Sequence, residues 1–184
     1  MKWSEGLQKL KESLMAKIVC TILRIYVGWE WLSRAIDKNF GSDSVNWVGS
    51  QAGSHVTAFM QGALQKSVGP HPDVQWLYVD FAQYVALPHA TIFSFLTAWG
   101  ELAVGIALIL GCFTTCALLG ALFLNFNYLF AGTVSMNPLL ILIETVLIWV
   151  GPSVYYLGLD HILLPKLKNN FGKGENILTI DRLN

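Results

Sequence analysis

The sequence predicts an all-α membrane protein: a four-transmembrane-helix bundle with both the N and C termini cytoplasmic and short interfacial helices in a long outward loop. Three observations predict this fold. Of the 184 residues, 54% are hydrophobic and 13% are charged, which is too apolar a balance for a soluble domain of this length to bury in one core. Four apolar segments approach the roughly 20 residues that a helix needs to cross a bilayer. Basic residues gather outside the first and the last of these segments.

The four predicted spans are apolar runs with few charges. They cover residues 18–36, 90–110, 112–131 and 139–159. Only a tight turn around Gly111 joins the second span to the third, so we expect these two to pack as an antiparallel hairpin. The first span follows a basic segment but lacks a small-residue cleavage site, which indicates a retained anchor rather than a signal peptide. The whole chain, residues 1–184, is predicted to be a single membrane domain.

The basic residues predict the orientation. Four lysines lie in residues 1–17, an amphipathic segment, and four Lys or Arg residues lie in the tail, residues 160–184. Because cytoplasmic flanks carry an excess of Lys and Arg, both segments are predicted to be cytoplasmic. The loop at residues 37–89 has only Lys38 and Lys66 as cations against four aspartates, so it is predicted to face outward.

The outward loop is too long to be a mere connection. Asp73 is a plausible N-cap for a helix with apolar residues at helical spacing that ends before Pro88. The apolar stripe consists of Val74, Leu77, Tyr78, Phe81 and Val85. Such a stripe is typical of a helix lying flat on a membrane interface. A second short helix is predicted from Ser54 to Ser67, and together the two helices would cap the mouth of the bundle.

Charged side chains inside the predicted spans are costly in lipid and normally turn into the bundle. They are Arg24, Glu30, Arg34, Glu101 and Glu144. Glu30 and Arg34 lie four residues apart on one helix face and can pair. Small residues beside Glu101, among them Gly105, allow a neighbouring helix to approach closely.

Several of these polar groups share a depth in the membrane. We expect Glu30, Glu101, Arg34, Asn125 and Asn127 to form a polar pocket beneath the outward loop, where they bind a ligand or handle protons. The alternative is that the same groups only hold the helices together. His89, at the outer end of the second span, is a further candidate for this pocket, although a lone interfacial histidine is often merely solvated.

Other function classes receive little support from the sequence. Twelve basic residues balance twelve acidic ones, so no basic stripe for a nucleic acid is present. No two histidines share a depth within the spans, and no Gly-rich dinucleotide fingerprint or paired CxxC spacing occurs, so no haem, flavin or metal site is predicted. Cys112 and Cys116 could form a redox pair, but they also suit the role of small buried apolar residues.

Short motifs follow one another along most of the chain, from about Ile18 to Pro165. They are Arg-Ile-Tyr-Val-Gly-Trp-Glu-Trp at 24–31, Ala-Leu-Pro-His at 86–89, Trp-Gly-Glu-Leu-Ala-Val-Gly at 99–105, Leu-Ile-Leu-Gly at 108–111, Asn-Phe-Asn at 125–127, Ala-Gly-Thr-Val-Ser at 131–135, Asn-Pro at 137–138 and Gly-Leu-Asp at 158–160. In these motifs and their order the chain resembles the DoxX-like membrane proteins, which include DoxD, taken as the larger subunit of thiosulfate:quinone oxidoreductase. The resemblance implies a multi-pass protein of a bacterial or archaeal plasma membrane.

For the DoxD branch, the resemblance implies oxidation of two thiosulfates to tetrathionate, with electrons passed to quinone as co-substrate. It also implies a second oxidoreductase subunit or a soluble redox protein as partner, beside membrane lipid and a possible second copy of the chain. Glu101 and Glu30 are then expected to supply protons. Basic and polar groups are expected to bind substrate, namely Arg34, Arg24, Lys38, His89, Asn125 and Asn127. Two alternatives remain open: a noncatalytic scaffold that recruits soluble redox or stress enzymes, and a small transport unit.

Overall fold

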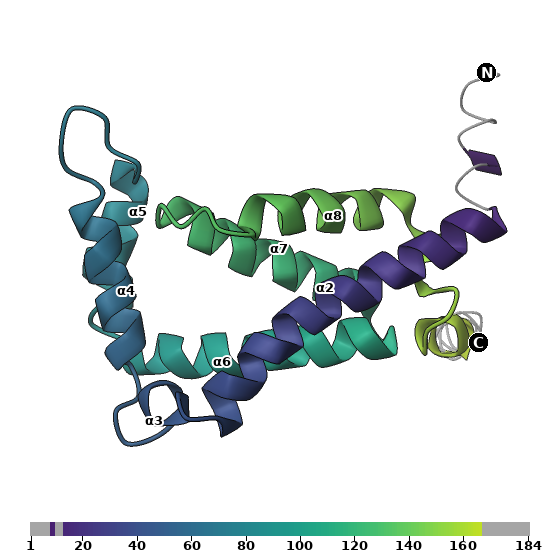
Figure 1. Cartoon of the computed structure of the whole chain (residues 1–184), viewed down its shortest axis with the longest axis horizontal. Helices are drawn as coiled ribbons and strands as arrows, with labels where there is room; N and C mark the ends of the chain where they lie inside the picture. The colour runs from purple at the N-terminus through teal and green to yellow at the C-terminus, as the bar shows by residue number, and fades with distance from the viewer. Residues whose placement is uncertain (1–7, 10–12, 167–184) are drawn as a thin grey trace, which may run out of the picture.

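The structure is a computed structural model that describes residues 8–9 and 13–166. Four longer helices lie alongside one another and form a bundle (Figure 1). They are α2 (Leu14–Phe40), α6 (Ala90–Leu110), α7 (Thr114–Phe130) and α8 (Asn137–Val150). The segment from 41 to 89, which we call the cap, stands across one end of the bundle. It holds α3 (Ser44–Trp47), α4 (Ser54–Gln65), α5 (Trp76–Asp80) and the π-helix η1 (Phe81–Ala86).

Helix α2 is longer than the predicted first span, by four residues at each end. It begins where the side chain of Ser13 accepts a hydrogen bond from the backbone N–H of Ala16 at 3.1 Å, as an N-cap residue does. It ends at Gly41, whose N–H donates to the carbonyls of Asp37 and Ile36. The extra turn beyond Ile36 brings Lys38 into the helix. Most of the predicted amphipathic segment, residues 1–17, lies outside the described residues.

The hairpin between α6 and α7 matches the prediction closely. Helix α6 has the predicted bounds, and α7 begins two residues later than expected, after a turn in which Gly111 and Phe113 take left-handed φ angles of 64° and 50°. The free N–H groups at the start of α7 donate hydrogen bonds to a residue that lies far along the chain. The carboxylate of Asp160 accepts hydrogen bonds from the N–H groups of Phe113 and Thr114, both at 2.7 Å.

The helix predicted for the last span, residues 139–159, ends earlier than expected. Helix α8 begins at Asn137 and stops at Val150, because Gly151 takes a φ of 75° and Pro152 follows it. A short 3₁₀-helix, η2 (Pro152–Tyr155), comes next, and the chain then returns along the end of α6. The tail beyond residue 166 lies outside the described residues.

The cap helices also differ in detail from the prediction. Helix α4 begins at Ser54 as expected and ends two residues early, at Gln65. The next helix is capped by Gln75 and not by Asp73, so that expectation is wrong. Its apolar stripe divides between two faces: Val74 and Tyr78 are buried, whereas Leu77 and Val85 are exposed.

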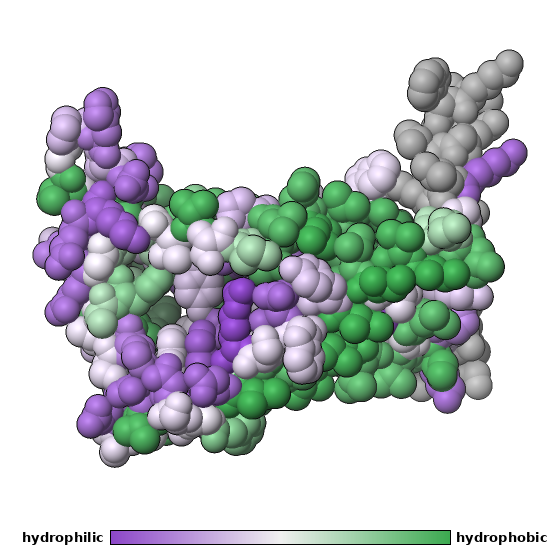
Figure 2. All heavy atoms as spheres, viewed as in Figure 1, coloured by the Kyte–Doolittle hydropathy of each residue, from purple (hydrophilic) through white to green (hydrophobic). Residues whose placement is uncertain are grey.

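The apolar surface of the bundle favours association with a membrane. Within the described residues, α6 is the helix that is long and apolar enough to cross a bilayer, while α7 and α8 are apolar helices of 17 and 14 residues. Figure 2 shows apolar side chains covering much of the visible face of the bundle, whereas polar ones gather over the cap end. The described residues form helices and no strand, which confirms the all-α part of the prediction, and the apolar surface of the bundle suits association with a membrane.

Glycines set the spacing between α2 and α6. A Cβ on Gly105 would lie 2.7 Å from the backbone nitrogen of Leu32, and one on Gly28 would lie 3.0 Å from the backbone nitrogen of Ile109. Both distances are too short for a side chain to be added without moving a backbone. The predicted close approach beside Glu101 is thus confirmed, and it places α2 and α6 where their polar side chains meet.

Candidate functional site

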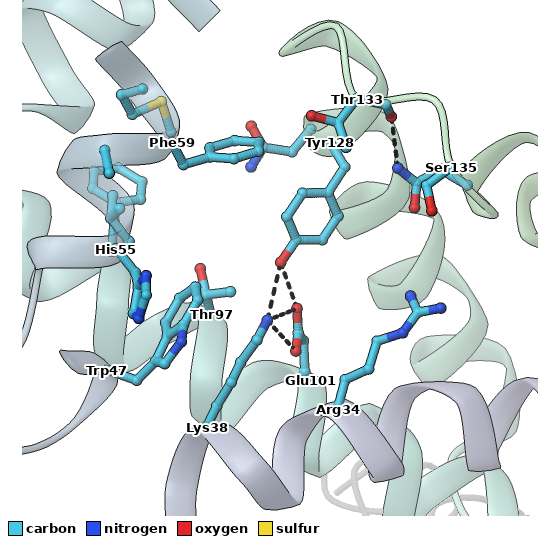
Figure 3. A pocket seen from close by; sticks show the side chains of 16 residues that line it. Arg34, Lys38, Trp47, His55, Phe59, Thr97, Glu101, Tyr128, Thr133 and Ser135 are labelled. Atoms are coloured by element: carbon cyan, nitrogen blue, oxygen red, sulfur yellow. Dashed lines mark hydrogen bonds and ion pairs between the residues drawn. The ribbon is translucent and has the colours of Figure 1, made fainter. Parts of the chain in front are cut away.

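A cavity of about 420 Å³ lies where the cap meets the bundle. Figure 3 shows its walls: side chains of α2 on one side, α3 and α4 on another, and α6 and α7 between them. The lining combines aromatic rings with charged and amide groups. It includes Arg34, Lys38, Trp47, His55, Phe59, Thr97, Glu101, Asn127 and Tyr128.

An ion pair forms the polar centre of the cavity. The ammonium group of Lys38 lies 2.7 Å from both carboxylate oxygens of Glu101, which is 1% exposed as a side chain. The hydroxyl of Tyr128 donates to the same carboxylate at 2.5 Å and lies 3.4 Å from the Lys38 nitrogen. Three elements, α2, α6 and α7, therefore converge on one carboxylate. The ammonium group offsets the cost of burying that charge.

The aromatic wall of the cavity is built on the cap. The Lys38 ammonium lies 4.3 Å from the centre of the Trp47 ring, within the range of a cation–π contact. The ring of His55 stacks on the Trp47 ring, with centroids 5.6 Å apart. Phe59 packs edge-on against Tyr128, with centroids 5.6 Å apart, and so joins α4 to α7.

Asp43 holds the outer part of this wall in place. It accepts hydrogen bonds from the Trp47 indole at 3.1 Å and pairs with His55 at 2.8 Å. The His55 hydrogen bond is the main cause that holds the pKa of Asp43 below its ordinary value. Because the folded-state pKa is lowered, this pair stabilises the fold above the ordinary Asp pKa, and the contribution is lost as the pH falls. The side chains of His55 and Asp43 are 41% and 36% exposed, so the pair contributes little to the stability of the fold.

The cap is tied to the bundle by further hydrogen bonds. Tyr78 of α5 donates to the amide oxygen of Asn127 at 2.8 Å, and burial raises the pKa of Tyr78. The Lys66 ammonium donates to the carbonyl of Gly132 at 2.9 Å, and Ser94 of α6 donates to the carbonyl of Trp47 at 2.7 Å. The cap thus covers the cavity and is held to α6, α7 and the loop after α7 by hydrogen bonds.

Arg34 lines the cavity from its more exposed side. Its guanidinium donates to Glu30 at 3.0 Å, so the predicted pairing of these two residues is observed. The side chains of Arg34 and Glu30 are 40% and 25% exposed, whereas those of Lys38 and Glu101 are largely buried. Glu30 itself is not among the residues that line the cavity.

The structure brings only some of the expected site residues together. Glu101, Arg34, Lys38 and Asn127 line the cavity. Asn125 instead lies in a separate buried cluster with Glu144. His89 precedes α6 and bonds through its ring nitrogen to the carbonyl of Val85 at 2.9 Å, away from the cavity lining.

Arg24 lies at the opposite end of the bundle. Its guanidinium, which is fully buried, donates to the carbonyls of Leu108 and Leu157, both at 2.8 Å, and so satisfies backbone groups where α6 ends. The cysteines lie outside the cavity lining as well. Cys20, Cys112 and Cys116 are free thiols of decreasing burial.

Sequence reasoning missed several residues that the fold brings to the cavity. Tyr128 follows the Asn-Phe-Asn motif directly and lies one turn from Asn125. This position in the sequence could have identified it as a further candidate for the site. Trp47, His55 and Phe59 come from two cap helices. No spacing rule links those helices to α2, so only the folded cap reveals these residues. Within the part of the chain that the structure describes, no cluster of three or more His, Cys, Asp or Glu residues could hold a metal ion.

The chain matches the model of a known protein family. The family model described as the small subunit DoxD of TQO, or thiosulfate:quinone oxidoreductase, matches residues 19–181. This description corrects the sequence-based expectation of the larger subunit. No curated protein and no solved structure matches the chain.

We predict that Lys38→Met destabilises the protein by about 3–5 kcal/mol, because it leaves the Glu101 carboxylate buried without its counter-charge. The measurement is thermal or denaturant unfolding of the purified protein in detergent. The double variant Lys38→Met/Glu101→Gln should recover most of the loss. Arg34→Met, which breaks the exposed pair, should cost at most about 1 kcal/mol. Equal losses for the two single variants would contradict this account of the ion pair.

Proposed function

The chain belongs to the DoxD family, the small subunit of thiosulfate:quinone oxidoreductase, and from this membership we propose that the cavity beneath the cap is where the quinone is reduced. The family name supplies the overall reaction. Two thiosulfates, one quinone and two protons yield one tetrathionate and one quinol. The tasks of this chain's residues are then to hold the quinone ring, to supply protons and to admit the thiosulfate anions.

We propose that α2, α6, α7 and α8 all cross the plasma membrane, with the cap outside and the termini in the cytoplasm. Packing of these four helices along one another supports this arrangement. The apolar surface of the bundle supports it too, as does the excess of basic residues near both termini. Helix α8 alone rises only about 21 Å at ~1.5 Å per residue, so η2 and the following turn complete its path.

The composition of the cavity suits a quinone headgroup. Its volume of about 420 Å³ falls within the range of small-molecule pockets, and its rings offer flat apolar contacts. Each charged group of the lining already has an opposite partner: Lys38 pairs with Glu101, and Arg34 pairs with Glu30. A neutral ring therefore fits the centre better than a dianion does, because a dianion would have to displace Glu101 from Lys38.

The ion pair provides the groups that proton transfer requires. A quinone oxygen takes on negative charge as electrons arrive, and a nearby ammonium or phenol group stabilises that charge by donating a hydrogen bond. Lys38 and Tyr128 both donate to Glu101 in the structure and could turn one donor toward a quinone oxygen. Glu101 would then take up a proton from water and pass it to whichever group has given one up.

Thiosulfate would bind on the more exposed side of the cavity. Arg34 is the cation that an anion can reach there, because its pair with Glu30 is exposed, whereas Lys38 is held by both oxygens of the buried Glu101. A guanidinium suits an oxyanion because it offers parallel N–H donors. Glu30 keeps this guanidinium in place until the anion arrives.

One observation carries the proposal: a buried Lys38–Glu101–Tyr128 group faces a cavity of ligand size. A scaffold that only recruits other enzymes has no need for such a group in a cavity, so the cavity favours the catalytic function. The second subunit, which the family description implies, is required in any assay of the complete reaction.

We predict that Glu101→Gln lowers thiosulfate-dependent quinone reduction by about 100-fold or more, the usual contribution of a general acid or base. The assay uses the purified complex with its second subunit, a soluble quinone analogue and thiosulfate. Asp80→Asn is the matched control, because it makes the same chemical change at an exposed position of the cap outside the cavity lining. A folded Glu101→Gln complex that retains more than half the wild-type rate would exclude the proposed role of this residue.

Arg34→Ala should act on the other substrate. We expect a rise of about 10-fold or more in the KM for thiosulfate, the equivalent of one lost hydrogen bond to a charged group. The KM for the quinone should stay within about twofold. Steady-state kinetics with each substrate varied in turn measures both values. An increase confined to the quinone KM would place thiosulfate elsewhere.

A further inference from the structure

A second carboxyl group is buried in the bundle, apart from the cavity. Glu144 of α8 is 0% exposed. The side-chain nitrogen of Asn125 lies 2.9 Å from both of its oxygens, and the indole N–H of Trp31 donates at 3.1 Å. Asn125 is 0% and Trp31 is 1% exposed. Helices α2, α7 and α8 thus meet around one carboxyl group.

No cation faces this carboxyl group among the described residues, since each basic side chain of the bundle is engaged elsewhere. Arg24 donates to two backbone carbonyls, and Lys17 lies over the ring of Tyr156 at the terminal end. Arg34 and Lys38 pair with Glu30 and Glu101. Glu144 therefore has neutral hydrogen-bond donors but no counter-charge.

The relative costs favour a proton on Glu144. An isolated carboxylate in an apolar interior costs several kcal/mol, even after the surroundings relax. Protonation removes this cost, and the amide of Asn125 can adapt to it. Its oxygen Oδ1 is buried without a partner, and half a turn of the amide would present that oxygen to an acidic O–H. The turn costs about 1–3 kcal/mol, because it leaves an N–H unpaired, which is less than the cost of the bare charge.

The Glu144 cluster lies inside the bundle, farther from the cap than the cavity does. Asn137, which lines the cavity, precedes Glu144 by two turns of α8, a rise of about 10 Å. Asn125 lies one turn from Tyr128 on α7. The two buried carboxyl groups therefore differ in their environments: Glu101 has a cation and Glu144 has none. Such pairs commonly divide into a base and an acid.

We propose that Glu144 carries a proton in the resting protein and supplies one of the two protons that the quinone takes up at the cavity. The second half of this proposal rests on the proposed function. When the electrons from two thiosulfates have reached the quinone, one proton comes from the Lys38–Glu101–Tyr128 group and the other from Glu144. The Glu144 carboxylate that remains is stabilised by the N–H donors of Asn125 and Trp31 until water reprotonates it.

Infrared difference spectroscopy tests the first half without any substrate. The complete chain in lipid nanodiscs should show a carboxylic-acid C=O band at neutral pH that shifts in D₂O and disappears in Glu144→Gln. Glu101→Gln is the matched control and should keep the band, because Glu101 pairs with the Lys38 ammonium whereas Glu144 has no counter-charge. Absence of the band in the wild type, or its persistence in Glu144→Gln, would overturn the protonated state.

Turnover of the complex tests the second half. Glu144→Gln keeps the size and neutrality of the acid but carries no proton to release, so we expect quinone reduction to fall about 10-fold or more at an unchanged thiosulfate KM, with partial recovery in Glu144→Asp. Wild-type turnover in Glu144→Gln, after loss of the infrared band, would overturn the proton supply. A wild-type complex that reduces no quinone would overturn the proposed function together with this proton supply. The infrared result would still decide the protonation of Glu144.

Discussion

A charged group inside an apolar helix bundle must find its partner within the protein, and the Lys38–Glu101 ion pair meets this demand at the point where the cap joins the bundle. The ammonium reaches the carboxylate because α2 continues to Phe40, one turn beyond its apolar stretch. The absence of side chains on Gly28 and Gly105 allows α2 and α6 to approach closely enough for the pair to form. The same carboxylate draws in Tyr128 from α7, so one ion pair fixes three helices.

The cavity is a consequence of this arrangement. Trp47 lies against Lys38, and His55 stacks on Trp47, so the cap is organised around the same ammonium group. Hydrogen bonds from Tyr78 and Lys66 to α7 and the loop after it hold the other side of the cap. Between these contacts remains a space of about 420 Å³ with both flat apolar surfaces and proton-exchanging groups. The deeper Glu144 cluster has the opposite character, because its charge has no counter-ion and is best removed by a proton.

Local rules predicted the parts of the fold that depend on local sequence. The bounds of α6, the turn at Gly111, the Glu30–Arg34 pair and the close approach at Gly105 follow from apolar length and helical spacing. The end of α8 was missed because the sequence after Gly151 remains apolar although its backbone leaves the helix. The sequence also could not predict which polar side chains would contact one another. Glu101 pairs with Lys38, and Asn125 contacts Glu144 instead of the cavity, because rotation of the helices about their axes decides these contacts. The residues of α3 and α4 entered the site only through the tertiary fold of the cap.

Labelling with a photoreactive quinone analogue tests the central claim most directly. After illumination of the complete complex, mass spectrometry of the peptides locates the attached quinone. The account predicts labels on cavity residues such as Phe59 and Tyr128, abolished by excess unlabelled quinone. A second hollow, lined by Lys17, Tyr156 and His161 at the opposite end of the bundle, serves as an internal comparison. Competable labelling confined to that hollow would contradict the account.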